Sequence, residues 1–387
     1  MSRFRSTDHF RTSLNVAATL LALAISAGCS ATDAAPTLDA LDALGAGSST
    51  EPASNDDSTS LATAPAVVRP AGAPAAEPSA SIPVGSRLAD GSIRPANELG
   101  RVMVLEYHLI GEEGRWTRDP ERLRQDFHLL YERGYRPVSV AEFMDDEVNL
   151  PEGLSPVIIT FDDASPSQFR YIEEADGSLT IDPSSAVGVW MEFGRNRPEW
   201  RNRAVFCLLP AAEAGRAFFG DKNIEGQKTE WRFQKVRFLA DQGFELCNHT
   251  LWHANLGRYD DAFVQEQIAR GVMAIDSVVP GYRVRTFALP LGIWPKNREL
   301  AYRGSWTDPR SGKVVSYDFD AVLEVAGGPT RSRHDSTFTA PARLNRVQVY
   351  GDELELTLDR LERAQRYVSD GRRGVIARPP NATAGVR

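Results

Sequence analysis

The chain has 387 residues, of which 42% are hydrophobic and 25% charged, the proportions of an ordinary globular protein, so global disorder is excluded. Its 44 lysines and arginines against 52 acidic residues give a formal net charge of -8. We therefore expect no nucleic-acid partner, because no excess of cations is available to neutralise phosphates. With only 3 cysteines, the chain cannot be built on a disulfide framework.

The N-terminus has the pattern of a bacterial export signal. Three arginines precede an apolar run at residues 14–25, and small residues then lead to Cys29. The run is too short to predict a transmembrane helix. Cys29 after small residues resembles a lipobox, although Ser26 stands where that pattern usually has Leu. We expect residues 1–29 to direct export, giving a lipoprotein anchored to the membrane of the cell envelope, or a secreted protein if Cys29 is not lipidated.

The remaining chain divides into three parts by composition. Residues 30–97 are dominated by Ala, Pro, Ser, Thr and Asp, and we expect them to form a disordered tether. Residues 98–370 carry regular hydrophobic patterns and form the predicted catalytic domain. Residues 371–387 are predicted to be a mobile tail.

Within the predicted domain, short apolar runs alternate with helical patterns. Strands are expected at 102–107, 135–140, 156–161, 204–209, 244–249, 284–290, 320–325 and 346–351, and helices at 120–133, 141–146, 230–242, 260–279 and 352–368. This alternation predicts right-handed crossovers and a parallel sheet, for which a closed or distorted (β/α) barrel is our first choice. Residues 164–203 interrupt the rhythm, with a helix start expected at Asp182-Pro183. That insertion either shapes the access of substrate to a site or only packs on the outside of the domain.

Two cysteines lie in strand-like apolar runs, Cys207 in "AVFCLLP" and Cys247 in "FELCNH". We interpret both as small buried hydrophobic residues. A bridge between them requires that the two strands be neighbours, in an oxidising compartment.

The strand at 156–161 ends in two adjacent carboxylates, Asp162 and Asp163. Ligands of parallel α/β folds and barrels bind at the carboxyl ends of strands. Because the chain bends there, one carboxylate can reach a metal while the other faces a bound water.

A pair of histidines follows a second strand, in "CNHTLWH". His249 and His253 are four positions apart, so a helical turn after His249 brings both imidazoles to one side. Together with one aspartate they make a three-ligand set for a zinc-like ion that leaves room for water and a substrate oxygen.

These motifs resemble those of the polysaccharide deacetylases, the NodB-homology or carbohydrate esterase family 4 group. "TFDD" and "HTLWH" are similar to the first and second motifs of that family, and "VLEYH", "YERGYRPVSVAEF", "GFELCNHTLWHANL" and "FALPLG" follow the family's order. The resemblance runs from Val102 to Val349 and implies a distorted (β/α) barrel of the NodB-homology type.

The resemblance also implies roles for individual residues. Asp162 becomes the general base, and Asp163, His249 and His253 hold a divalent ion, zinc in the first place, with cobalt or nickel as alternatives. The backbone N–H of Leu291, in the third motif, becomes the contact for the oxyanion, next to Pro290 in the substrate pocket.

The chain departs from the family pattern in two places. The third motif has Ala288 where the family carries an arginine that orients the catalytic aspartate, and Leu291 where it carries an aromatic residue. The C-terminal strand also lacks the Leu-x-His of many members, so the general acid is open.

Several other residues are candidates for a role at the site. His334, in a loop, is a candidate for the acid, with an exposed loop histidine as the alternative. His108 matches the family's "YH" and is expected to support the site, whereas His128 is expected on a helix surface. Trp294 is a candidate for stacking on a sugar, with packing as the alternative, and Trp252 is expected to form a wall of the pocket.

The leading interpretation is an exported, metal-dependent hydrolase that removes N-acetyl groups from a glycan polymer, of the peptidoglycan or poly-N-acetylglucosamine type. The alternatives are an O-acetyl esterase or other N-acyl hydrolase with the same fold, and a glycan-binding lipoprotein that has lost activity. The missing arginine and acid favour loss of activity, while the intact Asp162 beside three ligands argues against it.

Overall fold

A computed structural model describes residues 82–212, 217–363, 365–374 and 376–378. The export signal with Cys29, most of the predicted tether and the last residues of the predicted tail lie outside this range. Within the described part, no helix has the length and apolar character needed to cross a membrane.

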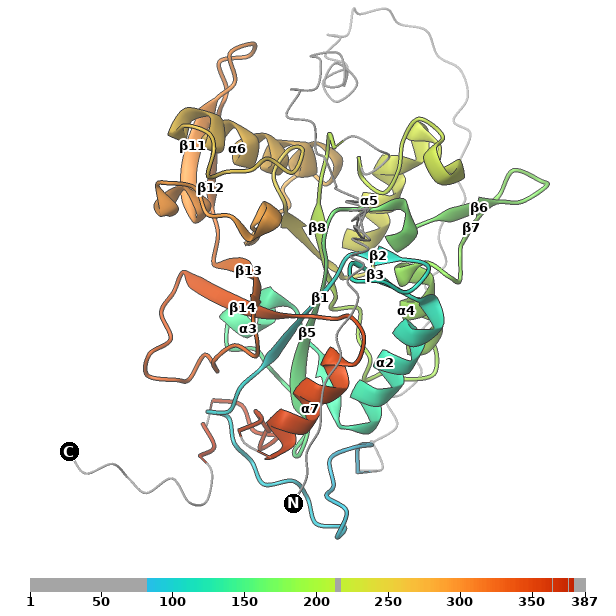
Figure 1. Cartoon of the computed structure of the whole chain (residues 1–387), viewed down its shortest axis with the longest axis vertical. Coiled ribbons are helices and arrows are strands. Elements are labelled where there is room, and N and C mark those ends of the chain that lie inside the picture. The colour runs from blue at the N-terminus through green and yellow to red at the C-terminus, as the bar shows by residue number, and fades with distance from the viewer. Residues whose placement is uncertain (1–81, 213–216, 364, 375, 379–387) are drawn as a thin grey trace, which may run out of the picture. The chain divides into compact units, whose positions relative to one another are not determined.

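The core is a closed barrel of seven parallel strands, as the alternating pattern predicted. Around the ring the order is β1, β14, β13, β10, β9, β8 and β5, and the ring closes because β1 pairs with both β14 and β5. The strands are β1 (Met103–Tyr107), β5 (Ser155–Phe161), β8 (Val205–Leu208), β9 (Glu245–Asn248), β10 (Thr286–Ala288), β13 (Ala321–Gly327) and β14 (Ala342–Gln348). In Figure 1, β1 and β5 run side by side through the middle of the domain.

The barrel is distorted beside β5. The short strand β4 (Tyr135–Pro137) pairs with residues 155–157 of β5, whereas β8 pairs with Thr160 and Phe161 near its other end. Strands β4 and β8 therefore pair with different parts of β5: β4 with its amino half and β8 with its carboxyl half. The prediction of a distorted (β/α) barrel is confirmed.

Helices connect most of the strands. They are α2 (Pro120–Glu132), α3 (Val140–Met144), α4 (Ala186–Gly194), α5 (Arg232–Asp241), α6 (Asp261–Val278) and α7 (Glu353–Arg363). Helix α2 begins after Asp119, whose side chain accepts hydrogen bonds from the backbone N–H groups of Glu121 and Arg122. The buried Leu123, Phe127 and Leu130 lie on one face of α2 and pack on the barrel.

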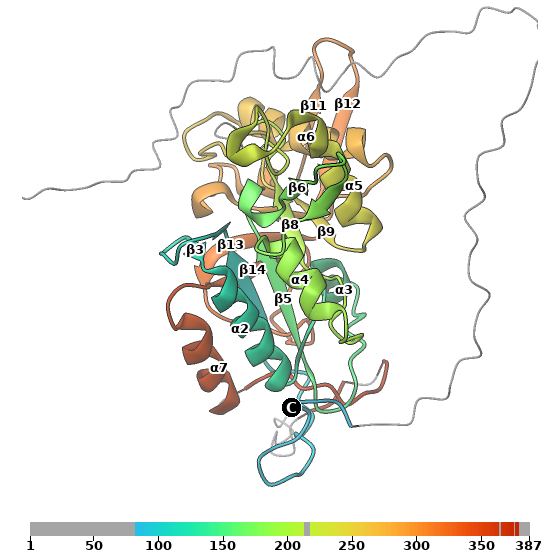
Figure 2. The same ribbon diagram turned by 90° about the vertical axis from the view of Figure 1, so that its right-hand side faces the viewer.

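Two crossovers are not helical. Between β10 and β13 an antiparallel hairpin, β11 (Arg303–Thr307) and β12 (Val314–Asp318), packs beside α6, as Figure 2 shows. Between β13 and β14, residues 328–341 form a loop without regular structure.

Short elements fill the other connections. They are β2 (Leu109–Ile110), β3 (Thr117–Arg118), β6 (Tyr171–Glu173), β7 (Leu179–Ile181) and the 3₁₀ turns η1 (Pro166–Gln168), η2 (Ile224–Gly226), η3 (Thr229–Trp231), η4 (Pro290–Gly292) and η5 (Arg298–Ala301). The insertion at 164–203 contains the β6–β7 hairpin and α4. That helix begins at Ala186, after the cap Ser185, and not at the predicted Asp182-Pro183.

The alternative of a bridge between the two cysteines is the one that the structure shows, so the preferred interpretation of two unbonded residues is wrong. Cys207 on β8 and Cys247 on β9 lie opposite each other in register and form a disulfide. Both side chains are buried, as expected, but they are covalently joined because neighbouring strands bring their Cα atoms to 4.2 Å.

The folded domain extends beyond both predicted boundaries. Residues 82–97, assigned to the tether, pack on the barrel. Gly85 lies so close to Gly134 that a Cβ on Gly85 would be 2.2 Å from the Gly134 backbone nitrogen. At the other end, the carbonyl of Ala377, in the predicted tail, accepts from the Glu98 N–H, and the Ala377 N–H donates to the Glu98 side chain. Backbone pairing holds these segments, and their composition gives no signal for it.

Candidate active site

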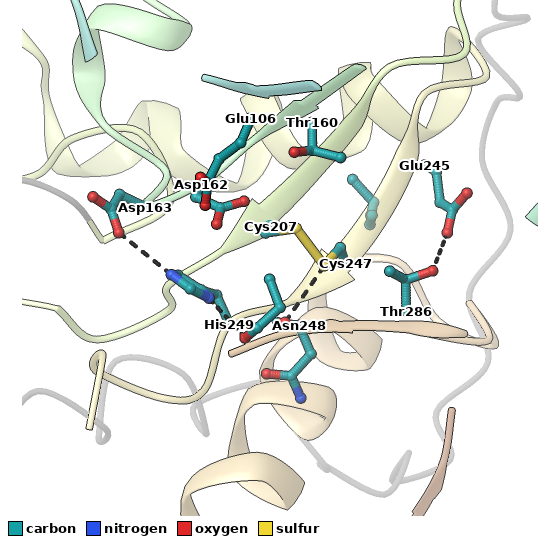
Figure 3. The surroundings of a disulfide bond; sticks show 12 residues. Glu106, Thr160, Asp162, Asp163, Cys207, Glu245, Cys247, Asn248, His249 and Thr286 are labelled. Carbon is teal, nitrogen blue, oxygen red and sulfur yellow. Dashed lines mark hydrogen bonds and ion pairs between the residues drawn. A yellow bond between two sulfur atoms is a disulfide. The ribbon is translucent and has the colours of Figure 1, made fainter. Parts of the chain in front are cut away.

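Asp162 and Asp163 leave β5 in different directions. All seven residues of β5 are buried, and the Asp162 N–H continues the pairing with β1 by donating to the Tyr107 carbonyl at 3.0 Å. At Asp163 the backbone turns into the left-handed region, with a φ of 78°. Because this turn ends the strand, Asp162 stays among the strands while Asp163 faces the β9 end, as Figure 3 shows.

The two histidines lie on a tight turn after β9. The Thr250 N–H donates to the Asn248 side chain at 2.7 Å, and the Thr250 hydroxyl accepts from the His253 N–H at 3.0 Å. Thr250 and His253 both have positive φ, 68° and 69°. A hydrogen-bonded turn, and not a helix, therefore brings the imidazoles together, and their ring centroids are 4.9 Å apart.

The three predicted ligands converge. The Nε2 atoms of His249 and His253 each lie 3.4 Å from Oδ1 of Asp163. Two ligand atoms bound at about 2.0–2.2 Å to a tetrahedral zinc are about 3.3 Å apart, so this spacing fits such an ion. The side chains of His249 and Asp163 are 2% and 9% exposed and that of His253 is 20% exposed, so one side of the cluster remains open for substrate.

The backbone of the third motif, at Ala288, orients the ring of His249. Nδ1 of His249 lies 2.9 Å from the carbonyl oxygen of Ala288, an acceptor, so Nδ1 carries the proton and Nε2 faces Asp163. Burial lowers the pKa of His249, but the hydrogen bond to Asp163 and the charge of Asp162 outweigh it and raise the pKa overall. Ala288 lacks the family's arginine side chain, yet it supplies this backbone contact.

An arginine that the sequence reasoning missed performs the orienting role. Arg346 on β14 is fully buried and donates two hydrogen bonds to Asp162, Nη1 to Oδ1 and Nη2 to Oδ2, both at 2.8 Å. Nη1 also donates to the Thr160 hydroxyl at 3.1 Å. Burial raises the pKa of Asp162, but the charges of Arg346 and then His249 outweigh it and hold that pKa below its usual range.

The sequence does contain a sign of Arg346, in the strand pattern "RLNRVQV". Arg346 alternates with Ala342 and Leu344, so its side chain lies on the same buried face of the strand. A charged side chain on that face must have a buried partner. Its partner could not be identified from the sequence, because β14 and β5 are not consecutive and meet only through β1.

A second cluster lies beside the first. Ligand atoms of Glu106, His108 and Asp162 lie within 4.8 Å of one another, and in isolation they would form a further metal site. However, Nη2 of Arg346 lies 2.6 Å from Glu106 and 2.8 Å from Asp162, so a guanidinium already supplies the positive charge. Burial raises the pKa of Glu106 to about 8, against the opposing effect of Arg346.

His108 lies at this edge of the barrel, at the end of β1, as the sequence predicted. Its ring packs edge-on to Trp116, with centroids 5.0 Å apart, and its side chain is 17% exposed. Burial lowers the pKa of His108, and the neighbouring Asp163 and Asp162 oppose that effect.

His334 is not at the site, so its assignment as the acid is wrong. Its Nε2 lies 3.1 Å from Asp146, in the segment that follows α3. The neighbouring Asp145 binds Arg285, which immediately precedes β10, so this pair marks the amino ends of the strands. The loop 328–341 returns the chain from the carboxyl end of β13 to the amino end of β14 and carries His334 away from the site.

The other predicted residues lie on or near the same edge. Pro290 is buried and Leu291 is 53% exposed with a φ of 58°, immediately after β10. The indole of Trp294 donates to Glu324 at 3.0 Å and packs near Tyr302, so part of its surface serves packing.

Two further residues lie outside the centre. Trp252, which was expected to form a wall of the pocket, packs toward Tyr259 and Phe263. His128 is exposed on α2, as expected.

Comparison with known proteins agrees with the motifs. Residues 202–303, which include His249 and His253, match the family described as Polysaccharide deacetylase. A chitooligosaccharide deacetylase of Sinorhizobium fredii is 28% identical over 178 residues, 43% of this chain and 79% of that protein. One from a Bradyrhizobium species is 32% identical over 62 residues, 16% of this chain and 28% of that protein.

Solved structures show distant likenesses. The Streptococcus pyogenes deacetylase PplD in complex with acetate has a TM-score of 0.46 at 14% identity, covering 69% of this chain and 98% of that chain. IcaB from Ammonifex degensii has a TM-score of 0.45 at 16% identity, covering 70% of this chain and 99% of that chain.

The barrel and the family match define the class of protein, a (β/α) barrel of the NodB-homology type. Part of the chain matches the polysaccharide deacetylase family, and the predicted resemblance to that family is confirmed.

Proposed function

We propose that this protein is a metal-dependent hydrolase that removes N-acetyl groups from a glycan polymer, of the peptidoglycan or poly-N-acetylglucosamine type. The observation that carries the proposal is the convergence of His249 and His253 on Asp163, beside a carboxylate, Asp162, that is held by an arginine. A pure binding protein needs no base next to a metal.

In the proposed mechanism Asp163, His249 and His253 would hold the divalent ion. A bound ion of this kind polarises the acyl carbonyl and acidifies water. Asp162 accepts the proton from the attacking water, and the two hydrogen bonds from Arg346 keep its carboxylate in one orientation during this transfer. The backbone N–H of Leu291 is proposed to donate to the oxyanion.

Among the described histidines, His108 replaces His334 as the proposed donor to the leaving nitrogen. His108 lies on the catalytic edge and belongs to the cluster with Asp162, and it is not one of the proposed ligands. The leaving amine takes one proton when the carbon–nitrogen bond breaks. Because burial lowers the pKa of His108, in this proposal His108 relays to the amine the proton that Asp162 accepted from water.

The substrate class rests on two supports. Relatives are named chitooligosaccharide deacetylases, which makes an N-acetylated glycan the natural first choice. The export signal and lipobox predicted from the sequence would bring the protein to the cell envelope, or lead to its secretion if Cys29 is not lipidated, and such polymers occur there. The anchor is tested by replacing Cys29 with Ser: the variant should leave the membrane fraction, and unchanged fractionation would contradict lipidation.

Acetate release tests the function. The full chain, loaded with zinc or cobalt, is given N-acetylglucosamine oligomers, peptidoglycan and acetylated xylan, with Asp162→Asn as the control. We expect release from an N-acetylated substrate that disappears in the control. Release from xylan alone would identify an O-acetyl esterase, and tight glycan binding without release would identify a binding protein.

A further inference from the structure

Glu106 is a buried carboxylate for which the proposed mechanism has no use. It lies near the carboxyl end of β1, where it pairs in register with Gln348 of β14, and its side chain is fully buried. The residues before it on β1 are apolar and buried, so the strand pattern alone would favour an apolar residue here.

The contacts of Glu106 lead to the catalytic base through one group. Its Oε1 lies 2.6 Å from Nη2 of Arg346, and the same nitrogen donates to Oδ2 of Asp162 at 2.8 Å. Figure 3 shows the side chains of Glu106 and Asp162 next to each other. Nη2 of the guanidinium is therefore held between two carboxylates.

The other atoms of the guanidinium are also held. Nη1 donates to Asp162 and to Thr160, and Nε donates to the backbone carbonyl of Glu324 on β13. A guanidinium has a rigid fork of donors, so fixing both of its ends fixes the orientation of a carboxylate bound to it.

Charge balance does not explain Glu106. A buried arginine and one buried aspartate already form a neutral pair, and a second buried carboxylate adds a desolvation cost of several kcal/mol before its interactions are counted. That cost is consistent with the raised pKa of Glu106. A residue that is expensive to bury and touches a catalytic group is a candidate for a functional role.

We propose that Glu106 is a positioning residue, which holds Arg346 so that the guanidinium presents Asp162 to the attacking water in one orientation. This inference rests on the proposed function of Asp162 as the base. Glu106 touches no reacting atom, so it acts on the rate only through Arg346. Its other neighbours are the Gln348 side chain, whose hydrogen bonding lowers the pKa of Glu106, and Nε2 of His108 at 3.9 Å, which is too far for a hydrogen bond.

The test compares two buried glutamates in the full chain. Glu106→Gln keeps the shape but replaces the ionisable carboxyl group that faces Arg346 with a neutral amide. We expect kcat for acetate release to fall about tenfold with KM within about twofold, because a small misplacement of a reacting group is costly. Zinc affinity should not change. The matched control is Glu245→Gln, a buried glutamate at the amino end of β9 that binds Thr286 and the Ala141 N–H, which should retain the wild-type kcat.

A double-mutant cycle shows whether Glu106 acts through Arg346. Arg346→Lys keeps a positive charge but cannot form the two-pronged contact. If the proposal holds, Glu106→Gln lowers kcat much less in the Arg346→Lys background than in the wild type. If the two substitutions lower kcat by independent factors that multiply in the double variant, the proposal is overturned. It is also overturned if the loss of kcat in Glu106→Gln matches the loss of folded protein.

A crystal structure of Glu106→Gln separates this inference from the proposed function. A displaced Arg346 with a rotated Asp162 supports positioning, and an unchanged pair of hydrogen bonds overturns it, whether or not the wild type releases acetate. Failure of the wild type on every substrate would reject the proposed function alone. If Glu106→Gln does not fold, Glu106→Asp, which keeps the carboxyl group but is one methylene shorter, takes its place in each measurement.

Discussion

The two ends of the barrel both bury carboxylates, but they balance the charge differently. At the amino end, Glu245 accepts hydrogen bonds from the Thr286 hydroxyl and the Ala141 N–H, and Glu142 faces both Arg201 and Arg203. At the carboxyl end, the carboxyl groups of Glu106 and Asp162 contact Arg346, and the charge of Asp163 also acts on it.

The difference shows where the fold can accept a cation. At the amino end, neutral donors and arginines satisfy the acidic groups, so those residues only stabilise the structure. At the carboxyl end, one arginine faces three acidic groups, and two imidazole nitrogens converge on the carboxylate farthest from it. An excess of buried negative charge with convergent nitrogen ligands is what a divalent cation compensates.

The largest effect should come from Asp162→Asn at the carboxyl end. Asparagine keeps the shape but cannot accept the proton, so we expect kcat to fall by about 10²–10⁴-fold, the usual contribution of a general base. Acetate release is the measurement, and zinc binding should remain. A variant with wild-type kcat would show that the carboxylate held by Arg346 is not the base.

Asp163→Ala should affect the metal most. Asp163 is the carboxylate on which both histidines converge, so its loss should reduce zinc affinity beyond the ~10–100-fold loss that follows when a residue that only orients a ligand is removed. Titration of the chelator-treated protein with zinc measures this. Unchanged affinity would place the ion elsewhere, and chelation of the wild type should abolish acetate release reversibly.

Arg346→Lys should lower kcat by about 10–100-fold, because an ammonium cannot hold both oxygens of Asp162 and a small misplacement of the base slows proton transfer. A matched change at the amino end, Arg201→Lys, removes a guanidinium from Glu142 and should leave kcat unchanged. Equal effects of both substitutions would mean that Arg346 only stabilises the barrel.

The pH dependence of stability should differ between wild type and Glu106→Gln in metal-free protein. Burial raises the pKa of Glu106 from 4.5 to about 8, so between these values the folded state binds more protons than the unfolded state. The free energy of unfolding contributed by this group therefore falls as the pH rises through that window.

Denaturant unfolding at several pH values between 4.5 and 8 tests this prediction. The free energy of unfolding should fall less steeply with rising pH in Glu106→Gln than in the wild type. Glu245→Gln provides the comparison at the other end, because burial also raises the pKa of Glu245. Identical slopes in wild type and Glu106→Gln would show that Glu106 is ionised throughout.

The smallest effect should come from His334→Ala at the amino end. This change removes a contact with Asp146, whose side chain is 49% exposed, so the loss of stability should be about 0–1 kcal/mol. Acetate release should stay at the wild-type rate. A large fall in kcat would restore His334 as the acid and contradict its position in the structure.

Local patterns were enough to predict much of the site. Asp162 and Asp163 follow a buried strand, and His249 and His253 follow another, so the rule that ligands bind at carboxyl ends placed all four at one edge. The same reasoning failed for His334, because residues 328–341 connect two parallel strands without a helix and the position of a loop residue along the barrel axis has no local signal. It missed Glu106 and Arg346, since each is a single charge in an apolar run.

The sequence by itself determined the alternation of strands and helices, the barrel, the ligand set and the resemblance to polysaccharide deacetylases, because hydrophobic periodicity and motif spacing are local properties. Tertiary structure alone decided which side chains meet across the ring. It joined Cys207 to Cys247, brought Arg346 of β14 to Asp162 at the end of β5, and packed residues 82–97 against the barrel. These contacts join segments far apart in the chain, and only closure of the sheet brings them within bonding distance.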